Sequence, residues 1–209
     1  MALSLLLQNI TMNYLAHAYL SFNRPDILAG NMISDYVKGK KQFEYSTSVQ
    51  CGIKLHRIID AFTDNHAATK TIKSYFRPHY RLYAGAFADV VYDYFLATDK
   101  NEFGQENDLL LFSQNTYKQL AQFETVFPAK FAAMFPYMQQ QNWLYNYRTE
   151  WGIQKSFGGL VRRSAYLTDA GMAAEIFAAN KNIFQQQYNL FFPAVKKMAA
   201  EQLQVLLKT

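Results

Sequence analysis

Several residue types and motifs are scarce or missing in this chain of 209 residues. Its one cysteine, Cys51, excludes an intrachain disulfide scaffold. Five prolines and nine glycines are too few for a collagen-like or loop-dominated protein. The chain also lacks a Gly-x-x-x-x-Gly-Lys phosphate loop, a Gly-x-Gly-x-x-Gly fingerprint and a Gly-x-Ser-x-Gly elbow. The sequence therefore gives no sign of these three kinds of site.

Long apolar runs are missing as well. None approaches the roughly 18 residues that a membrane span needs, so we expect no transmembrane helix. The apolar run at 2–7 is short and no basic residue precedes it, which argues against a signal peptide. We expect a cytoplasmic protein.

The composition is that of a globular protein with a large core. Half of the residues (50%) are hydrophobic, 16% are aromatic and 18% are charged, and at about 150 residues per domain the length predicts one domain. The net charge of +5 favours an acidic partner or substrate, which leaves nucleic acid, an anionic membrane and an acidic protein possible.

Helix start and stop signals dominate the chain, and no stretch alternates with period two long enough to predict a strand. We therefore predict an all-α fold, with helices over roughly 26–38, 49–65, 67–76, 82–98, 109–127, 150–163 and 172–208. Prolines mark the expected breaks: Pro78 ends one helix, Pro136 and the polar run at 139–142 separate further short helices, and Pro193 kinks the last.

The sharpest chemical feature is a polar stripe on the predicted helix over 49–65. Residues four apart share a helix face, so His56, Asp60 and Asp64 align. Such a stripe is usually only solvated, but two aspartates four apart repel each other, and a bound cation would relieve that repulsion. Asp89 and Asp93 repeat the spacing on a helix that is apolar nearly all round. Buried carboxylates there need either basic partners or a metal.

Two further candidates are ambiguous taken singly. Asp35 could be an exposed helical residue, and His17, in an apolar run, could be a hydrogen-bonded core histidine. Together, one or two histidines and three or four aspartates suit a divalent metal with mixed nitrogen and oxygen ligands, such as Mn²⁺, Fe²⁺, Mg²⁺ or Zn²⁺. The lack of cysteine ligands argues against a closed structural zinc site.

Basic residues are concentrated between Lys38 and Arg81. This stretch contains nine of them and only three acidic residues, Glu44, Asp60 and Asp64. If the two aspartates face a metal, the remaining surface there is markedly basic. Ordinary solvated lysines are the alternative.

Four motifs in the first half resemble the acyl carrier protein phosphodiesterases in order and spacing: Asn13 to His17, Gly30 to Asp35, Gly52 to Asp64, and Asp89 to Leu96. Residues 143–198 are similar more loosely, and residues 1–11 precede the family's usual start. The resemblance implies an HD-like helical bundle over 12–209 with residues 1–11 as an N-terminal extension. It also implies hydrolysis of the phosphodiester that links 4′-phosphopantetheine to a carrier-protein serine, with a divalent metal, usually manganese.

The resemblance also implies roles for individual residues. The implied metal ligands are Asp35, His56, Asp60 and Asp89. The implied catalytic group consists of His17 as ligand or acid/base, Lys38 and Arg57 as stabilisers of phosphate charge, and Asp64 and Asp93 as orienting residues. We expect Lys70, Lys73 and Arg77 to dock the acidic carrier protein, and we expect no nucleic-acid partner.

Two other functions remain open at this point. An HD-type phosphohydrolase acting on a nucleotide or another small phosphodiester would share the metal centre without a protein-docking face. A non-enzymatic helical binding module would have its acidic residues merely paired.

Overall fold

The computed structural model describes residues 14–208, and in this range the chain is helical without any strand. The α-helices are α2 (Tyr14–Tyr19), α3 (Pro25–Ile33), α4 (Thr47–Asn65), α5 (Ala67–Tyr80), α6 (Ala84–Thr98), α7 (Asp108–Ala121), α8 (Ala129–Gln140), α9 (Trp143–Asn146), α10 (Glu150–Arg163) and α11 (Gly171–Leu206). Short 3₁₀ segments are η1 (Ser34–Tyr36), η2 (Gly39–Glu44), η3 (Arg81–Tyr83) and η4 (Glu124–Val126). The all-α prediction is confirmed. The predicted extension at 1–11 lies outside the described residues.

Side-chain caps fix the starts of α4 and α5, two of the helices that carry site residues. Ser46 accepts a hydrogen bond from the Val49 amide at the start of α4. His66 follows the last residue of α4 and accepts from the Ala68 amide, so one residue separates α4 from α5. The predicted helices at 49–65 and 67–76 are therefore both present, and the second is longer than predicted.

The predictions at two prolines are wrong, because Pro78 lies inside α5 and Pro136 inside α8. Pro193 lies inside the last helix, α11, as predicted, but the irregular backbone position of that helix is elsewhere. A proline in a helix interior costs about 3 kcal/mol because one backbone hydrogen bond is lost. Burial of neighbouring apolar residues offsets that cost: Tyr80 follows Pro78 in the core, and Phe192 precedes Pro193 there.

The irregular position in α11 is Asn180, with φ −119° and ψ 16°. Its side-chain Nδ2 donates to the Ile176 carbonyl at 2.9 Å. That carbonyl would accept the Asn180 backbone amide in a regular helix, so the side chain competes with the backbone for the same acceptor. This explains why the kink lies at an asparagine that the sequence analysis did not select.

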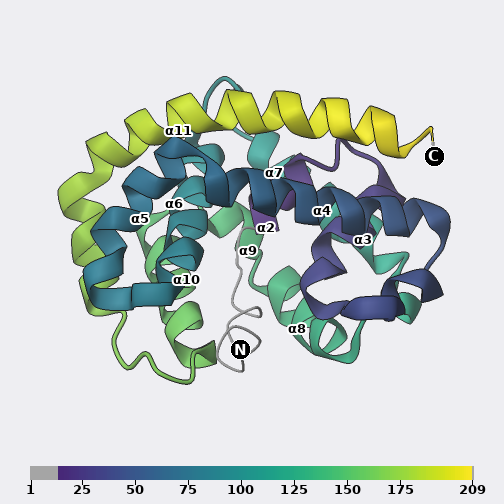
Figure 1. The fold of residues 1–209 in the computed structure, drawn as a ribbon, viewed down its shortest axis with the longest axis horizontal. Coiled ribbons are helices and arrows are strands. Elements are labelled where there is room, and N and C mark those ends of the chain that lie inside the picture. The colour runs from purple at the N-terminus through teal and green to yellow at the C-terminus, as the bar shows by residue number, and fades with distance from the viewer. Residues whose placement is uncertain (1–13, 209) are drawn as a thin grey trace.

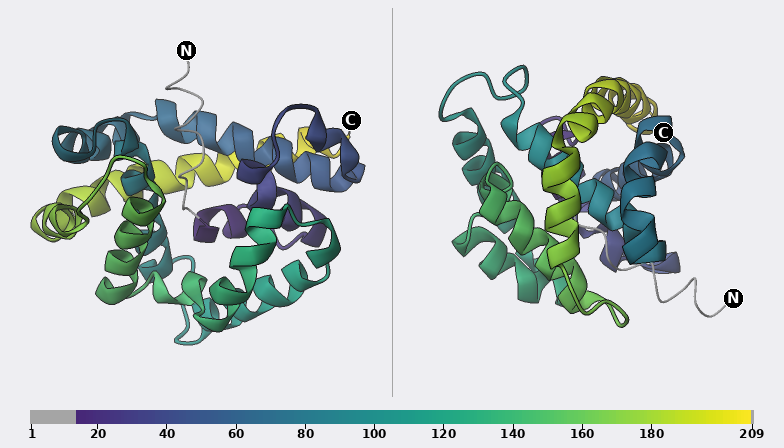
Figure 2. Two further views of the ribbon diagram at one scale, coloured as in Figure 1. Left: turned by 90° about the horizontal axis from the view of Figure 1, so that it is seen from below. Right: turned by 90° about the vertical axis from the view of Figure 1, so that its left-hand side faces the viewer.

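The longest helix, α11, runs along one edge of the molecule and packs against α4 and α5 (Figure 1). Figure 2 shows α11 and α4 side by side in both views. Helix α4 also packs against α3, so it is covered along two sides. Among residues 14–208, no helix is both long and apolar enough to cross a membrane.

Helices α3 and α4 touch through their backbones at two glycines. A Cβ on Gly30 would lie 2.0 Å from the Val49 carbonyl oxygen, and one on Gly52 would lie 2.3 Å from that of Ile27. Any side chain at either position would separate the two helices. This crossing brings Asn31, next to Gly30, within hydrogen-bond reach of His56, one turn after Gly52.

Candidate metal centre

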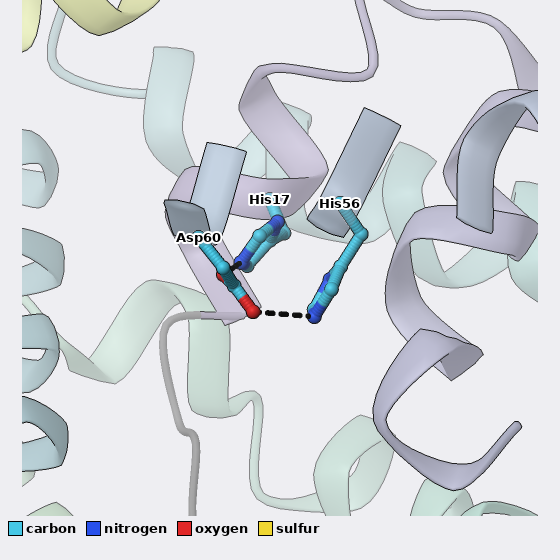
Figure 3. A group of neighbouring side chains, drawn as sticks. All are labelled: His17, His56 and Asp60. Atoms are coloured by element: carbon cyan, nitrogen blue, oxygen red, sulfur yellow. Dashed lines mark ion pairs between the residues drawn. The ribbon is translucent and has the colours of Figure 1, made fainter. Parts of the chain in front are cut away.

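His17 from α2 meets His56 and Asp60 from α4 in a cluster of two buried histidines and a half-buried aspartate (Figure 3). The Asp60 carboxylate lies between the two rings: Oδ1 is 3.2 Å from Nε2 of His17, and Oδ2 is 3.1 Å from Nε2 of His56. The rings stack with centroids 4.0 Å apart and an interplanar angle of 20°. One potential ligand atom from each of the three residues lies within 4.8 Å of the other two, as a shared metal ion requires.

The amide of Asn31 holds both histidines from the other side. Its Oδ1 lies 2.7 Å from Nδ1 of His17 and 3.2 Å from Nδ1 of His56. Its Nδ2 donates to the His17 carbonyl at 3.0 Å and to Oγ of Ser21 at 3.1 Å. Because a carbonyl oxygen only accepts, the contact with His17 fixes which end of the amide is oxygen. Both Nδ1 atoms therefore donate to Oδ1, and both Nε2 atoms face Asp60.

The residues present fit a divalent metal ion. Nε2 of His17 is buried and makes no hydrogen bond within the described chain, although it lies close to Asp60. Two imidazole nitrogens held through their opposite Nδ1–H groups, next to one carboxylate, form a mixed nitrogen and oxygen donor set. The cluster can thus hold a divalent metal ion, as the sequence analysis predicts.

The electrostatics of the cluster also favour a cation. Burial lowers the pKa of His17, and the neighbouring His56 lowers it further. Burial also lowers the pKa of His56, but Asp60 and Asp35 outweigh it and raise that pKa to about 10. A proton on His56 therefore balances the carboxylates at neutral pH, and a metal ion would displace it.

The cluster lies at a cavity of about 610 Å³ between α4, α6 and the η1–η2 segment. Asp35 and Asp89, which the resemblance adds to the ligand set, lie on its wall but outside the three-residue cluster. Oδ1 of Asp35 is 3.3 Å from Nε2 of His56. Burial raises the pKa of Asp89, and the charges of Asp60, Asp64 and Asp93 raise it further. Neither residue's role as a ligand is tested by this geometry, and both assignments stay predictions.

Three cations line the same cavity: Lys38, Arg57 and Lys73. The Arg57 guanidinium donates to Oε1 of Gln42 at 2.7 Å and to the Val37 carbonyl at 3.1 Å, so its position is fixed. Lys73 lies 2.9 Å from Oδ1 of Asp64. The structure thus separates Lys73 from Lys70 and Arg77, which are exposed on α5 and do not line the cavity.

Asp93 lies behind the cluster and not in the cavity wall. It is fully buried and accepts hydrogen bonds from the amides of Leu15 at 3.1 Å and Ala16 at 2.9 Å. Asp93 thereby fixes the first turn of α2, which carries His17, at the cluster. Asp64, by contrast, is exposed and faces Lys73.

The sequence analysis includes Asn31 in the Gly30 to Asp35 motif but predicts no role for it. The available signal was an amide next to a glycine, in a helix that the structure shows buried over most of its length. A buried amide needs partners for both of its ends. The sequence does not reveal those partners, because both histidines reach Asn31 only through the packing of α2 and α4 on α3.

We expect Asn31→Leu to weaken metal binding about 10–100-fold, the usual cost of losing a partner that orients a ligand. Both Nδ1–H groups would lose their acceptor, and the rings would no longer be held toward Asp60. Titration calorimetry with Mn²⁺ measures the loss. Ser21→Ala is the matched control, since it removes one hydrogen bond to the same amide but leaves Oδ1 in place. Equal affinities in wild type and Asn31→Leu would contradict this role.

An all-helical chain with a His–His–Asp cluster beside a cation-lined cavity has the features of a metal-dependent phosphohydrolase. The family model described as acyl carrier protein phosphodiesterase matches residues 12–195, and the chain belongs to this family.

Curated relatives with that name align over nearly their whole length. The protein of Enterobacter sp. (strain 638) is 30% identical over 188 residues, which cover 90% of this chain and 97% of the relative. That of Serratia proteamaculans is 30% identical over 191 residues, with coverage of 91% and 98%. That of Yersinia pestis is 28% identical over 190 residues, with coverage of 90% and 97%. The predicted family is confirmed. No solved structure matches the chain, so the HD-like subdivision of the fold stays a prediction.

Proposed function

We propose that this protein hydrolyses the phosphodiester between the serine of holo-acyl carrier protein and 4′-phosphopantetheine, which yields the apo-carrier protein. The observation that carries the proposal is the His17, His56 and Asp60 cluster at a cavity that three cations also line, in a chain of this family. The cavity, at about 610 Å³, lies within the range of small-molecule sites and is large enough for the phosphopantetheine arm.

His17, His56 and Asp60 would hold the divalent metal, with Asp35 and Asp89 as the predicted additional ligands. When bound, the metal would polarise the phosphoryl group and lower the pKa of a bound water. We propose Mn²⁺, because two nitrogens with carboxylate oxygens suit it, and Mg²⁺, Fe²⁺ and Zn²⁺ are compatible too. The geometry favours His17 as a ligand over an acid/base role, since Nδ1 faces Asn31 and Nε2 faces Asp60.

Lys38 and Arg57 would bind the non-bridging oxygens of the phosphodiester. Arg57 is already held by Gln42 and the Val37 carbonyl, so little further ordering is needed when the substrate arrives. Asp64 would orient Lys73, with which it pairs at the cavity wall, and would not orient a metal ligand. Because Asp64 contacts the Lys73 ammonium on one side, the substrate could contact that ammonium only from the other side.

Mass spectrometry of holo-acyl carrier protein tests the proposed reaction. Incubation with the enzyme and Mn²⁺ should remove the mass of 4′-phosphopantetheine from the carrier protein, and a chelator should prevent this. Cleavage of small nucleotide diesters but not of holo-carrier protein would support the HD-type phosphohydrolase instead. Protein without bound metal and without metal-dependent activity would support the binding module. The cytoplasmic location stays a prediction.

We expect the exposed cations of α5 to accelerate encounter with the acidic carrier protein. Lys70→Glu combined with Arg77→Glu should lower kcat/KM on holo-carrier protein by up to about 10-fold at low salt and leave kcat unchanged. Lys73 is kept, because it lines the cavity and pairs with Asp64. The difference should vanish near 1 M salt, where the Debye length is about 3 Å.

The matched control reverses two exposed lysines elsewhere, Lys118 on α7 and Lys130 on α8, which do not line the cavity. If the control pair lowered kcat/KM as much as the α5 pair, the effect would come from net charge and not from a docking surface. If kcat/KM of the α5 double variant were unchanged, Lys70 and Arg77 would be ordinary solvated residues without a docking role.

A further inference from the structure

A second cavity, of about 350 Å³, lies among the end of α8, α9 and α10, and shares no lining residue with the first. Its described lining residues are Gln141, Trp143, Asn146, Tyr147, Trp151, Gly152, Lys155, Ser156, Gly159, Arg162 and Arg163. Helices α9 and α10 are labelled in Figure 1. The proposed reaction uses none of these residues.

The charge of this second cavity has one sign. Its lining includes Lys155, Arg162 and Arg163, and no acidic side chain among the described lining residues. Lys155 and Arg162 are exposed, and neither has a salt bridge within residues 14–208. Lys155 and Arg162, two basic groups that line one cavity without an acidic lining residue, are suited to bind an anion.

The aromatic lining is equally distinctive, because the two tryptophans of the chain both belong to it: Trp143 and Trp151. Trp151 is 56% exposed, which is unusual for so large an apolar ring. The Lys155 ammonium lies 5.5 Å from the centre of the Trp151 ring. A flat or apolar group could therefore pack on the indole within reach of a cation.

The wall that carries the tryptophans is closely packed. A Cβ on Gly152 would lie 1.9 Å from the Asn146 carbonyl oxygen, so α9 and α10 touch through their backbones. Trp143 Nε1 donates to Oε1 of Gln141 at 3.0 Å, and Nδ2 of Asn146 donates to the Gln141 carbonyl at 2.7 Å. The cavity is thus preformed on helices, which lowers the entropy cost of binding.

We propose that this second cavity binds an organic phosphate, with the phosphate at Lys155 and Arg162 and a flat or apolar group on Trp151. The chemistry is shared by a nucleotide monophosphate such as AMP and by 4′-phosphopantetheine, so the source of the ligand is left to experiment. This proposal stands on the cavity itself and holds whether or not the proposed hydrolysis is correct.

Intrinsic tryptophan fluorescence tests the proposal directly, because every tryptophan of the protein lines the second cavity. The full-length protein is titrated with AMP, 4′-phosphopantetheine, adenosine and inorganic phosphate. We expect saturable quenching by AMP, by 4′-phosphopantetheine or by both, and binding at least 10-fold weaker for adenosine and for inorganic phosphate. AMP alone would identify a nucleotide site, and 4′-phosphopantetheine alone a site for the pantetheine arm.

Charge reversal locates the binding. Arg162→Glu and Lys155→Glu should each weaken it at least 10-fold, whereas Lys130→Glu should leave it unchanged. Asp60→Asn separates the two cavities, because it should abolish hydrolysis of holo-carrier protein and leave the fluorescence titration unchanged. No saturable quenching by either organic phosphate, or equal affinity in Arg162→Glu and wild type, would overturn the proposal. So would inorganic phosphate or adenosine binding as tightly as the organic phosphates.

Discussion

Replacing Asp60 with asparagine is expected to lower kcat/KM on holo-acyl carrier protein by more than about 100-fold, because even a residue that only orients a ligand costs ~10–100-fold. Each oxygen of the Asp60 carboxylate faces one histidine, so both contacts change at once. Metal content after dialysis against Mn²⁺ should fall in parallel with activity. Helical circular dichroism should stay near that of the wild type, since Asp60 is partly solvent-accessible.

Asp64→Asn is the matched control for this experiment. It makes the same chemical change one helical turn further along α4, at a side chain that is 68% exposed and pairs with Lys73. We expect it to retain bound metal and to lose less than about 10-fold in kcat/KM, in keeping with the small worth of an exposed ion pair. If metal were lost in Asp64→Asn and kept in Asp60→Asn, the metal would bind near Asp64 and not at the His17, His56 and Asp60 cluster.

A single added methyl group at Gly30 should destabilise the protein by about 2 kcal/mol or more. Its Cβ would lie 2.0 Å from the Val49 carbonyl oxygen, so Gly30→Ala forces α3 away from α4. Better helix propensity returns at most about 1 kcal/mol. Urea unfolding measures the change. Because the shift also moves Asn31 away from His56, metal affinity should fall even under conditions in which the variant remains folded.

Gly158→Ala makes the same substitution inside α10, where the nearest neighbour of the new Cβ would be Arg162 at 3.5 Å, an ordinary contact. There the helix propensity term should dominate and leave stability unchanged or raised by up to about 1 kcal/mol. Similar unfolding midpoints for the two variants would mean that α3 and α4 accommodate a methyl group, and that their backbone contact does not fix the metal centre.

The part of the site that a single helix contains could be predicted from the sequence. Four-residue spacing places His56 and Asp60 on one face of α4 whatever the tertiary structure, and the structure has both in the cluster. The same rule added Asp64, but α5 supplies Lys73 to that position, and no periodicity within α4 could reveal it. His17 illustrates the opposite limit, because its place depends on how α2 packs and on Asp93 from α6.

The fold class followed from helical punctuation, but single prolines were misleading. The cost of a proline is local and fixed, whereas the gain from burying neighbours such as Phe76 and Tyr80 depends on partners from other helices. The kink at Asn180 had the opposite cause: a polar side chain competes for its own helix's carbonyl. Sequence patterns predict such helix breaks poorly, because tertiary burial decides whether the local cost of a proline or the gain from packing dominates.

The hydrogen bonds of Asn31 leave almost no freedom in the choice of residue at this position. An aspartate has the same shape and could still accept from both imidazoles. It would, however, place an oxygen against the His17 carbonyl, where Nδ2 now donates. Ser21 could rotate its hydroxyl to adapt, but a backbone carbonyl cannot become a donor. Position 31 should therefore tolerate fewer substitutions than any of the exposed cations around the cavity, although Asn31 is fully buried and does not line the cavity.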